Sequence, residues 1–146
     1  KNTNNLVVIS PIEGTPASQA GVQINLIIRG MCCLYPGKKN LSENISVISI
    51  IGRFLEHSRI FWFANDGNPE VFLGSADWMR RNLDRRIEAV TPIEDPELRK
   101  RLEGVLDIYL KDNQGSWEMQ SDGTFVQRKS NGEEKCAQND LIELWN

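Results

Sequence analysis

The chain has 146 residues, of which 40% are hydrophobic and 25% are charged, values typical of one globular domain with a single core. A formal net charge of −3 argues against a general nucleic-acid or anionic-membrane binder. The charge is uneven, because residues 1–90 carry ten Lys and Arg against eight Asp and Glu, whereas residues 91–146 carry seven against twelve. An anion-binding site is therefore expected in the first part of the chain.

The cysteine pattern favours a reducing compartment. There are three cysteines, two of them adjacent at Cys32 and Cys33, and no C-x-x-C spacing that would predict a disulfide scaffold or a zinc site. No apolar run approaches the roughly 18 residues that a membrane span needs, and the amino terminus lacks the layout of a signal peptide. These features predict a cytoplasmic protein that binds no metal through this chain and has no transmembrane segment.

The first half of the chain alternates short apolar runs with breakers. Pro11, Gly14 and Pro16 interrupt the first twenty residues, so a short strand followed by a loop is expected there. Aliphatic runs at 22–28 and 45–51 are typical of strands buried on both faces, and the segment 31–44 between them reads as a loop. Ala17 to Gly21 predicts one helical turn.

The second half combines hairpins with helices. Asn65-Asp66-Gly67 is a strong turn signal between the predicted strands 59–63 and 70–73. Asp95-Pro96 predicts the start of a helix that runs to about Asp112, with a further strand at 87–93 before it. A hairpin of 117–119 with 124–127 and a small amphipathic helix at 137–145 complete the chain. Strands interleaved with helices predict an α/β fold.

Arg29 stands where a buried strand ends. Ligands of open α/β sheets gather beyond the carboxyl ends of the strands, so an arginine at this edge is a candidate anion ligand. A surface arginine that only ends a strand is an equally good interpretation of the same residues.

His57 is the only histidine, and it lies in a stretch, 52–88, that also contains six arginines. A side chain that titrates near neutral pH beside guanidinium groups, which hold phosphate oxygens in pairs, predicts phosphoryl chemistry. A period of two would place His57 and Arg59 on one face if their strand begins early. A lone histidine is more often structural.

Gly74-Ser75 ends the predicted second strand of the hairpin, and Asp77 follows it. Glycine permits close backbone approach to a ligand, and the serine hydroxyl can donate to a phosphate oxygen. Four arginines follow: Arg80, Arg81, Arg85 and Arg86. They either line an anionic channel or pair with nearby carboxylates on a solvated face, and pairing is favoured for at least two of them.

Three segments together resemble a known family. The runs IIRGMCCLYPG, LSENISVISIIGRFLEHSRIFWFAN and GSADWMRRNLDRRIEAVTPIEDPELR are similar to the second carboxy-terminal catalytic domain of the histidine-phosphorylating polyphosphate kinases. The resemblance covers about residues 17–146. It implies a phospholipase D-like fold, that is, a mixed sheet flanked by helices in a single domain that forms one half of a two-half catalytic unit.

The resemblance also implies a function. The family transfers the terminal phosphate of ATP reversibly to inorganic polyphosphate, with magnesium, through a phosphohistidine on a preceding domain that is absent here. Arg29 falls on its nucleotide-phosphate-binding arginine and His57 on its second active-site histidine. On chemical grounds Arg59, close to His57, is expected to be a further phosphate ligand. Ser75 and Asp77 occupy the place of the Gly-Ser-x-Asn segment that follows the histidine motif in phospholipase D-like enzymes, and they are candidates for a supporting role. The implied partners are ATP or ADP, polyphosphate, the remaining kinase domains and a homo-oligomeric copy. The magnesium ligands are expected in the missing domain.

The resemblance divides the chain into an atypical segment 1–16, a core 17–112 and a carboxy-terminal extension 113–146 of the same domain. Two departures leave alternatives open. Arg59 and Ala64 stand where the superfamily's phosphodiesterases have lysine and aspartate, and Pro11, Gly14 and Pro16 do not suit the family's helix before residue 17. The alternatives are a fragment that binds nucleotide or polyphosphate without turnover, and a homodimeric phospholipase D-like phosphodiesterase.

Overall fold

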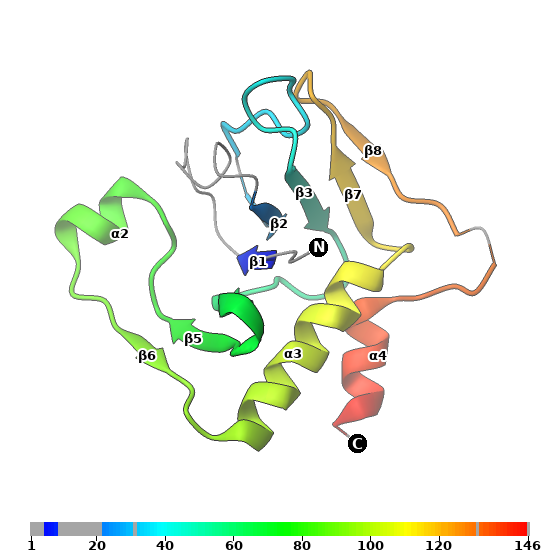
Figure 1. The fold of residues 1–146 in the computed structure, drawn as a ribbon. Coiled ribbons are helices and arrows are strands. Elements are labelled where there is room, and N and C mark those ends of the chain that lie inside the picture. Colours follow the sequence, from blue (N-terminus) through cyan, green and yellow to red (C-terminus); the bar gives the residue numbers. More distant parts are fainter. Residues whose placement is uncertain (1–4, 9–21, 31, 131, 146) are drawn as a thin grey trace.

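Eight strands form one mixed sheet in the computed structural model, which describes residues 5–8, 22–30, 32–130 and 132–145. The strands are β1 (Asn5–Val8), β2 (Gln23–Ile27), β3 (Ile45–Ile50), β4 (Ile60–Phe63), β5 (Glu70–Gly74), β6 (Val90–Pro92), β7 (Ser116–Met119) and β8 (Phe125–Gln127). Their order across the sheet is β6-β5-β4-β1-β2-β3-β7-β8. The strands of Figure 1 therefore run from β6 at one edge to β8 at the other.

The centre of the sheet is parallel and its two wings are antiparallel. β1 pairs with β2 and β2 with β3 in parallel, whereas every pair formed by the other strands is antiparallel. Residues 5–8 thus lie inside the sheet, between β4 and β2, within the segment 1–16 that the sequence marks as atypical. The predicted helical turn at 17–21 lies outside the described residues.

Strict alternation sends neighbouring residues of the central strands to opposite faces of the sheet. Leu26 is 1% exposed and packs on one face, while Ile27, which follows it, packs on the other. One face carries a buried cluster that includes residues of the helices: Ile27, Ile48, Ile50, Ile60, Val71, Val105, Leu106, Tyr109 and Ala137. The other face carries a second buried cluster: Ile24, Leu26, Ile28, Ile45, Val47, Phe61 and Met119.

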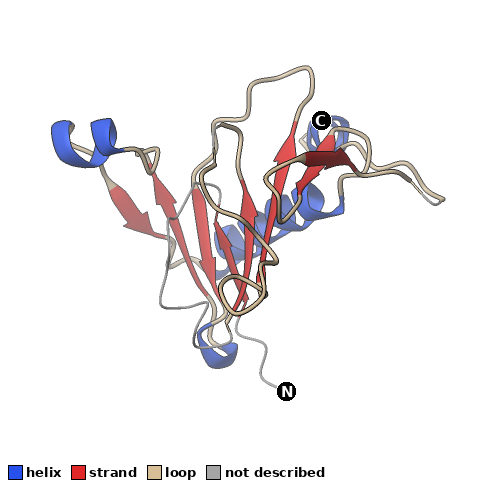
Figure 2. Ribbon diagram, turned by 90° about the horizontal axis from the view of Figure 1, so that it is seen from above, coloured by secondary structure: helices blue, strands red, loops and turns tan. Residues whose placement is uncertain are grey.

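Two helices, α3 (Pro96–Lys111) and α4 (Ala137–Leu144), cover one face of the sheet side by side (Figures 1 and 2). Asp95 caps α3, since its carboxylate accepts hydrogen bonds of 2.9 Å from the amides of Glu97 and Leu98. A short helix, α2 (Arg80–Arg85), lies beyond β5, away from α3 and α4, and a 3₁₀ turn, η1 (Asn65–Gly67), joins β4 to β5. No helix in the described residues is long and apolar enough to cross a membrane.

Asp112 fastens the carboxy-terminal part to the rest of the fold. Its side chain is fully buried, at 2% exposure, directly after α3. One carboxylate oxygen accepts from the amides of Gln114, Gly115 and Ser116 at 3.1, 2.8 and 2.8 Å, and the other accepts from Ala137 at 2.7 Å. A single carboxylate therefore joins the end of α3, the start of β7 and the start of α4.

The expected α/β fold, a mixed sheet flanked by helices, is confirmed, and so are the hairpin at Asn65-Asp66-Gly67 and the helix capped by Asp95. One predicted element differs, and one helix was not predicted. The strand predicted for 87–93 is only Val90–Pro92, with Ile87 fully exposed, and the polar segment after Met79 forms the helix α2.

Candidate functional site

Arg29, which follows β2, reaches the loop that carries His57. Its Nη1 donates a hydrogen bond of 2.6 Å to the backbone carbonyl of Glu56, 27 positions away in the sequence. β2 and β3 are parallel neighbours, so the end of β2 and the chain that leaves β3 meet at the same edge of the sheet. Arg29 and the residue that precedes His57 are thus brought together by the topology.

Arg59 holds the imidazole of His57. Its Nη1 lies 2.8 Å from Nδ1 of His57 and donates to the His57 carbonyl at 2.9 Å, while its Nη2 lies 3.2 Å from Nε2. A guanidinium group is always charged and only donates, so it bonds a ring nitrogen only when that nitrogen carries no proton. A neutral imidazole has one such nitrogen. The contacts with Arg59 therefore hold the imidazole ring next to a permanent positive charge.

Asp77 orients Arg59. One oxygen of its carboxylate accepts from Nε of Arg59 at 3.1 Å and from Nη2 at 2.8 Å, and the Arg59 side chain is only 10% exposed. Asp77 follows β5, which pairs with β4, so neighbouring antiparallel strands supply the two charges. The result is a chain of contacts from Asp77 through Arg59 to His57.

Ser75 lies in a different set of contacts. Its hydroxyl donates to the Glu88 carboxylate at 2.5 Å and accepts from the Ala89 amide at 3.0 Å. Asn82 is buried at 2% exposure and donates to the same carboxylate at 3.0 Å. Ser75 therefore ties β5 to the segment before β6, and its hydrogen bonds in the described structure do not join it to His57.

The four arginines of residues 80–86 are mostly unpaired. Arg80 forms a 3.4 Å ion pair with Asp84, in which both side chains are more than half exposed. Within the described part of the chain the other three form no ion pair, so the structure shows one such pair where at least two were expected. Asp77 pairs with Arg59 and Glu88 bonds Ser75 and Asn82, which takes both carboxylates away from this cluster.

A cavity of about 520 Å³ opens beside His57 on the helix side of the sheet. His57, Ser58 and Arg59 form its polar end, and the remaining lining is mainly apolar: Ile60, Leu73, Gly74, Leu102, Val105, Tyr109, Leu141 and Trp145. A charged ligand could approach His57 from this end while an apolar group occupies the rest.

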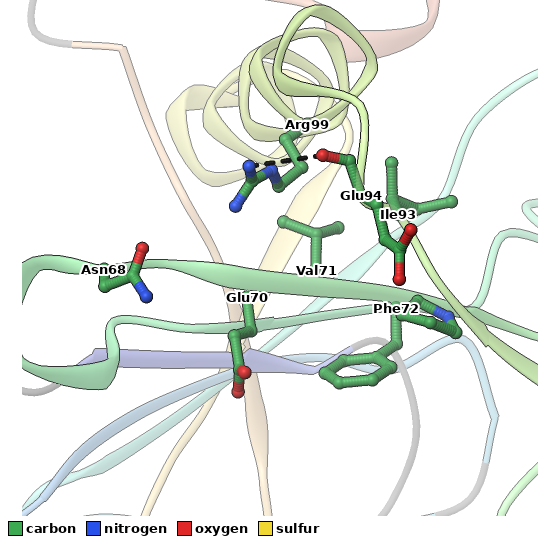
Figure 3. A pocket seen from close by; sticks show the side chains of 8 residues that line it. Asn68, Glu70, Val71, Phe72, Ile93, Glu94 and Arg99 are labelled. Carbon is green, nitrogen blue, oxygen red and sulfur yellow. Dashed lines mark hydrogen bonds between the residues drawn. The ribbon is translucent and has the colours of Figure 1, made fainter.

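A second cavity, of about 260 Å³, lies between β5 and the start of α3 (Figure 3). Arg99 donates there to the carbonyls of Pro69 and Glu94, at 3.1 and 3.3 Å, as the dashed line of Figure 3 marks for Glu94. The Arg99 guanidinium already bonds backbone oxygens, and the carboxylates of Glu70 and Glu94 also line the cavity. This cavity therefore does not suit an anion.

Three residues that the sequence did not single out support the His57 loop. The Tyr109 hydroxyl donates to one oxygen of the Glu56 carboxylate at 2.6 Å, and the Gln138 amide donates to the other at 2.8 Å. Burial raises the pKa of Tyr109, and the nearby Glu56 carboxylate raises it further, so the hydroxyl stays a donor. Tyr109 belongs to the apolar stripe of α3, which masks its polar role, and no sequence signal marks Gln138.

The carboxylates near His57 do not fit a magnesium site. Asp77 is engaged by Arg59, and Glu56 is engaged by Tyr109 and Gln138. No group of three or more His, Cys, Asp or Glu in the described residues is arranged to hold a metal ion. Magnesium prefers carboxylate oxygens with free positions for water and phosphate, whereas both oxygens of Glu56 and one oxygen of Asp77 already accept hydrogen bonds.

Comparison with known sequences identifies relatives along most of the chain. The family model for the polyphosphate kinase C-terminal domain 2 matches residues 7–139. Polyphosphate kinases of Prochlorococcus marinus (strain MIT 9313) and Parasynechococcus marenigrum (strain WH8102) are 70% and 66% identical to the chain, each over 88% of it. The chain spans only 18% of the length of each of these relatives.

Solved structures agree with the sequence relatives. The crystal structure of polyphosphate kinase from Porphyromonas gingivalis matches 99% of this chain with 24% of its own, at a TM-score of 0.91 and 35% identity. NucT from Helicobacter pylori, at a TM-score of 0.54 and 13% identity, matches 73% of this chain and 79% of its own, a likeness of fold alone. The chain therefore belongs to the polyphosphate kinase family, as its C-terminal domain 2.

Proposed function

We propose that this domain binds the phosphates of ATP and of inorganic polyphosphate at Arg29, His57 and Arg59, and so assists reversible transfer of the terminal phosphate of ATP to polyphosphate. One observation carries the proposal. Arg29 donates to the carbonyl of Glu56 and Arg59 donates to the carbonyl of His57, so both guanidinium groups bond consecutive residues of the loop that carries the single imidazole. Positive charge gathered in this way is suited to a phosphate chain.

The chain supplies part of a catalytic unit. Because it spans 18% of its curated relatives, the reaction is assigned to the parent kinase, with the phosphorylated histidine on another of its domains. The isolated chain should bind nucleotide and polyphosphate but transfer no phosphate. We further propose that the parent kinase acts in the cytoplasm.

Phosphoryl transfer depends more on position and charge than on covalent help from the protein, because the transferred group carries its charge on three equatorial oxygens. Arg29 and Arg59 would neutralise those oxygens through paired hydrogen bonds. His57 would protonate the leaving oxygen or, when charged, bind a phosphate. Asp77 would keep the Arg59 guanidinium in one orientation while the ligand changes.

Magnesium, which the family resemblance implies, would arrive with the nucleotide and take its protein ligands from the rest of the parent kinase. The engaged carboxylates of Glu56 and Asp77 support this division of labour. No step assigned here to the residues of this chain depends on the metal.

A phosphodiesterase built from two copies of the chain is the weaker alternative. Arg59 is committed to Asp77 and His57, whereas that chemistry uses a lysine at this position in the superfamily, and Ala64 has no carboxylate. The likeness to NucT concerns the fold alone.

The phosphate-binding role of Arg29 predicts a loss of affinity on truncation. Arg29→Ala should weaken tripolyphosphate or ATP binding by about 1–3 kcal/mol, roughly five- to 150-fold, because a charge-assisted contact is lost. Isothermal titration calorimetry on the 146-residue chain measures this effect. Lys129→Ala, at an exposed position after β8, is the charge-matched control and should change affinity less than twofold. Equal affinity in Arg29→Ala and wild type would remove Arg29 from the site.

A further inference from the structure

The loop that carries His57, residues 52–58, has no helix or strand of its own. Such a loop keeps one conformation only if side chains from elsewhere satisfy its backbone and hold it. In this chain the holding groups come from α3 and α4, which lie beneath the loop on the helix face of the sheet. The position of His57 therefore depends on elements that carry no candidate phosphate ligand.

Gln138, in the first turn of α4, gives all the hydrogen bonds of its amide to this loop. Its Nε2 donates to the carbonyl of Phe54 and to the carboxylate of Glu56, both at 2.8 Å, and its Oε1 accepts from the Phe54 amide at 2.9 Å. The side chain is nearly completely buried, at 6% exposure. A buried amide with every bond directed at one loop fixes both the position and the rotation of that loop.

Glu56 is the point through which the helices reach the site. Its carboxylate faces the helices, where Tyr109 of α3 and Gln138 of α4 donate to its two oxygens, while its backbone carbonyl accepts from Arg29. A shift of the Glu56 side chain therefore moves the group that anchors Arg29 and the residue next to His57.

Gly52 leaves the room that this attachment needs. A Cβ atom at position 52 would lie 2.4 Å from Oε1 and 2.7 Å from Cδ of Gln138. Any larger residue would push the Gln138 amide away from Phe54 and Glu56. The chain thus keeps a glycine at the start of the loop and a buried glutamine 86 residues later that fit together.

We propose that Gln138 and Tyr109, acting through Glu56, are positioning residues that set Arg29 and His57 at the spacing a phosphate chain requires. The inference rests on the proposed function for the identity of the ligand, but the attachment itself is a property of the ligand-free protein. The helix α4 is accordingly needed for phosphate recognition although it contacts no phosphate.

The single histidine of the chain makes the attachment measurable, since one imidazole gives one set of NMR signals. Gln138→Glu keeps the side-chain length and an acceptor for the Phe54 amide. It removes the donor to both the Phe54 carbonyl and Glu56, and it brings two carboxylates into contact. In the ligand-free variant we expect the His57 signals to shift and broaden and the Phe54 amide to exchange about tenfold faster or more. Affinity for tripolyphosphate should fall by about tenfold.

Asn139→Asp is the matched control for Gln138→Glu. It adds the same negative charge to α4 at an exposed neighbouring position, and it should leave the His57 signals, the Phe54 exchange rate and the affinity unchanged. Glu56→Gln, combined with Gln138→Glu, exchanges the amide and the carboxylate, so that the amide at position 56 donates to the carboxylate at position 138. The double variant restores the contact between positions 56 and 138 but not the donor to the Phe54 carbonyl. It should therefore return the His57 signals most of the way to those of wild type and the affinity to within about threefold.

Gly52→Ala disturbs the same contacts by placing a Cβ atom against the Gln138 amide. It therefore tests the positioning role even if Gln138→Glu does not fold. It should reproduce the change in the His57 signals without any new charge. Two results would overturn the positioning role. One is wild-type His57 signals and a wild-type Phe54 exchange rate in the folded single variants. The other is a double variant whose His57 signals stay as they are in Gln138→Glu, with a lowered melting temperature. A wild-type chain that does not bind tripolyphosphate would instead refute the proposed function. The His57 signals of the ligand-free variants would still test the role of Gln138.

Discussion

Replacing Arg59 by methionine should lower phosphoryl transfer by the parent kinase by about 100-fold or more, the usual effect of removing one preorganised donor from a charged transition state. The methionine keeps most of the buried stem, but the contacts to His57 and the ion pair with Asp77 are lost together. The imidazole is then free to rotate and one phosphate-neutralising charge is absent. Initial rates of polyphosphate synthesis from ATP measure the effect.

Two further variants locate the cause. Arg59→Lys keeps the charge but not the planar fork, and it should cost about tenfold, since an ammonium group cannot contact Asp77 and His57 in the same way. Arg101→Met, at an exposed arginine of α3 that lies over Trp145, should leave the rate unchanged. Transfer by Arg59→Met within threefold of wild type would show that Arg59 serves only the fold.

Replacing Asp112 by leucine should have the largest effect on stability. The change leaves four backbone amides without an acceptor, those of Ser116 and Ala137 in buried contacts and those of Gln114 and Gly115 in partly buried ones. At about 1–3 kcal/mol for each buried donor left unsatisfied, the loss should reach about 4 kcal/mol or more, a large share of a typical domain's stability. Urea denaturation followed by circular dichroism measures the free energy of unfolding.

The control for Asp112 is Asp107→Asn, one turn earlier on the same helix. That carboxylate is 58% exposed and pairs with Lys111, so its loss should cost less than about 0.5 kcal/mol. Similar costs for the two changes would mean that the Asp112 carboxylate does not hold α3, β7 and α4 together.

Local patterns predicted most of the elements because each of those patterns is complete in itself. Asp95-Pro96 contains both the cap and the first residue of α3, and Asn65-Asp66-Gly67 sits between two apolar strands. The short helix α2 escaped prediction because its six residues, four of them charged, carry no apolar stripe. The strand order, in which β1 separates β4 from β2, depends on pairings that no local pattern encodes.

The candidate site was predictable in part. The place of Arg29 at the end of a buried strand made it a candidate anion ligand at that sheet edge, and the structure brings it to the carbonyl of Glu56, next to His57. The nearness of His57 and Arg59 was also predicted, although β4 begins only at Ile60 and the contact comes from the arginine reaching back. The roles of Gln138 and Tyr109 could not be predicted, because they depend on α4 and α3 packing beneath a loop far away in the sequence.

The most direct test of the account is a titration of the 146-residue chain with tripolyphosphate, followed through the imidazole signals of His57. The account predicts that the signals move to saturation in the wild-type chain, and that Arg29→Ala needs about five- to 150-fold more ligand to reach the same end point. Signals of His57 that stay in place while calorimetry records binding would contradict it, because the phosphate site would then lie elsewhere on the chain.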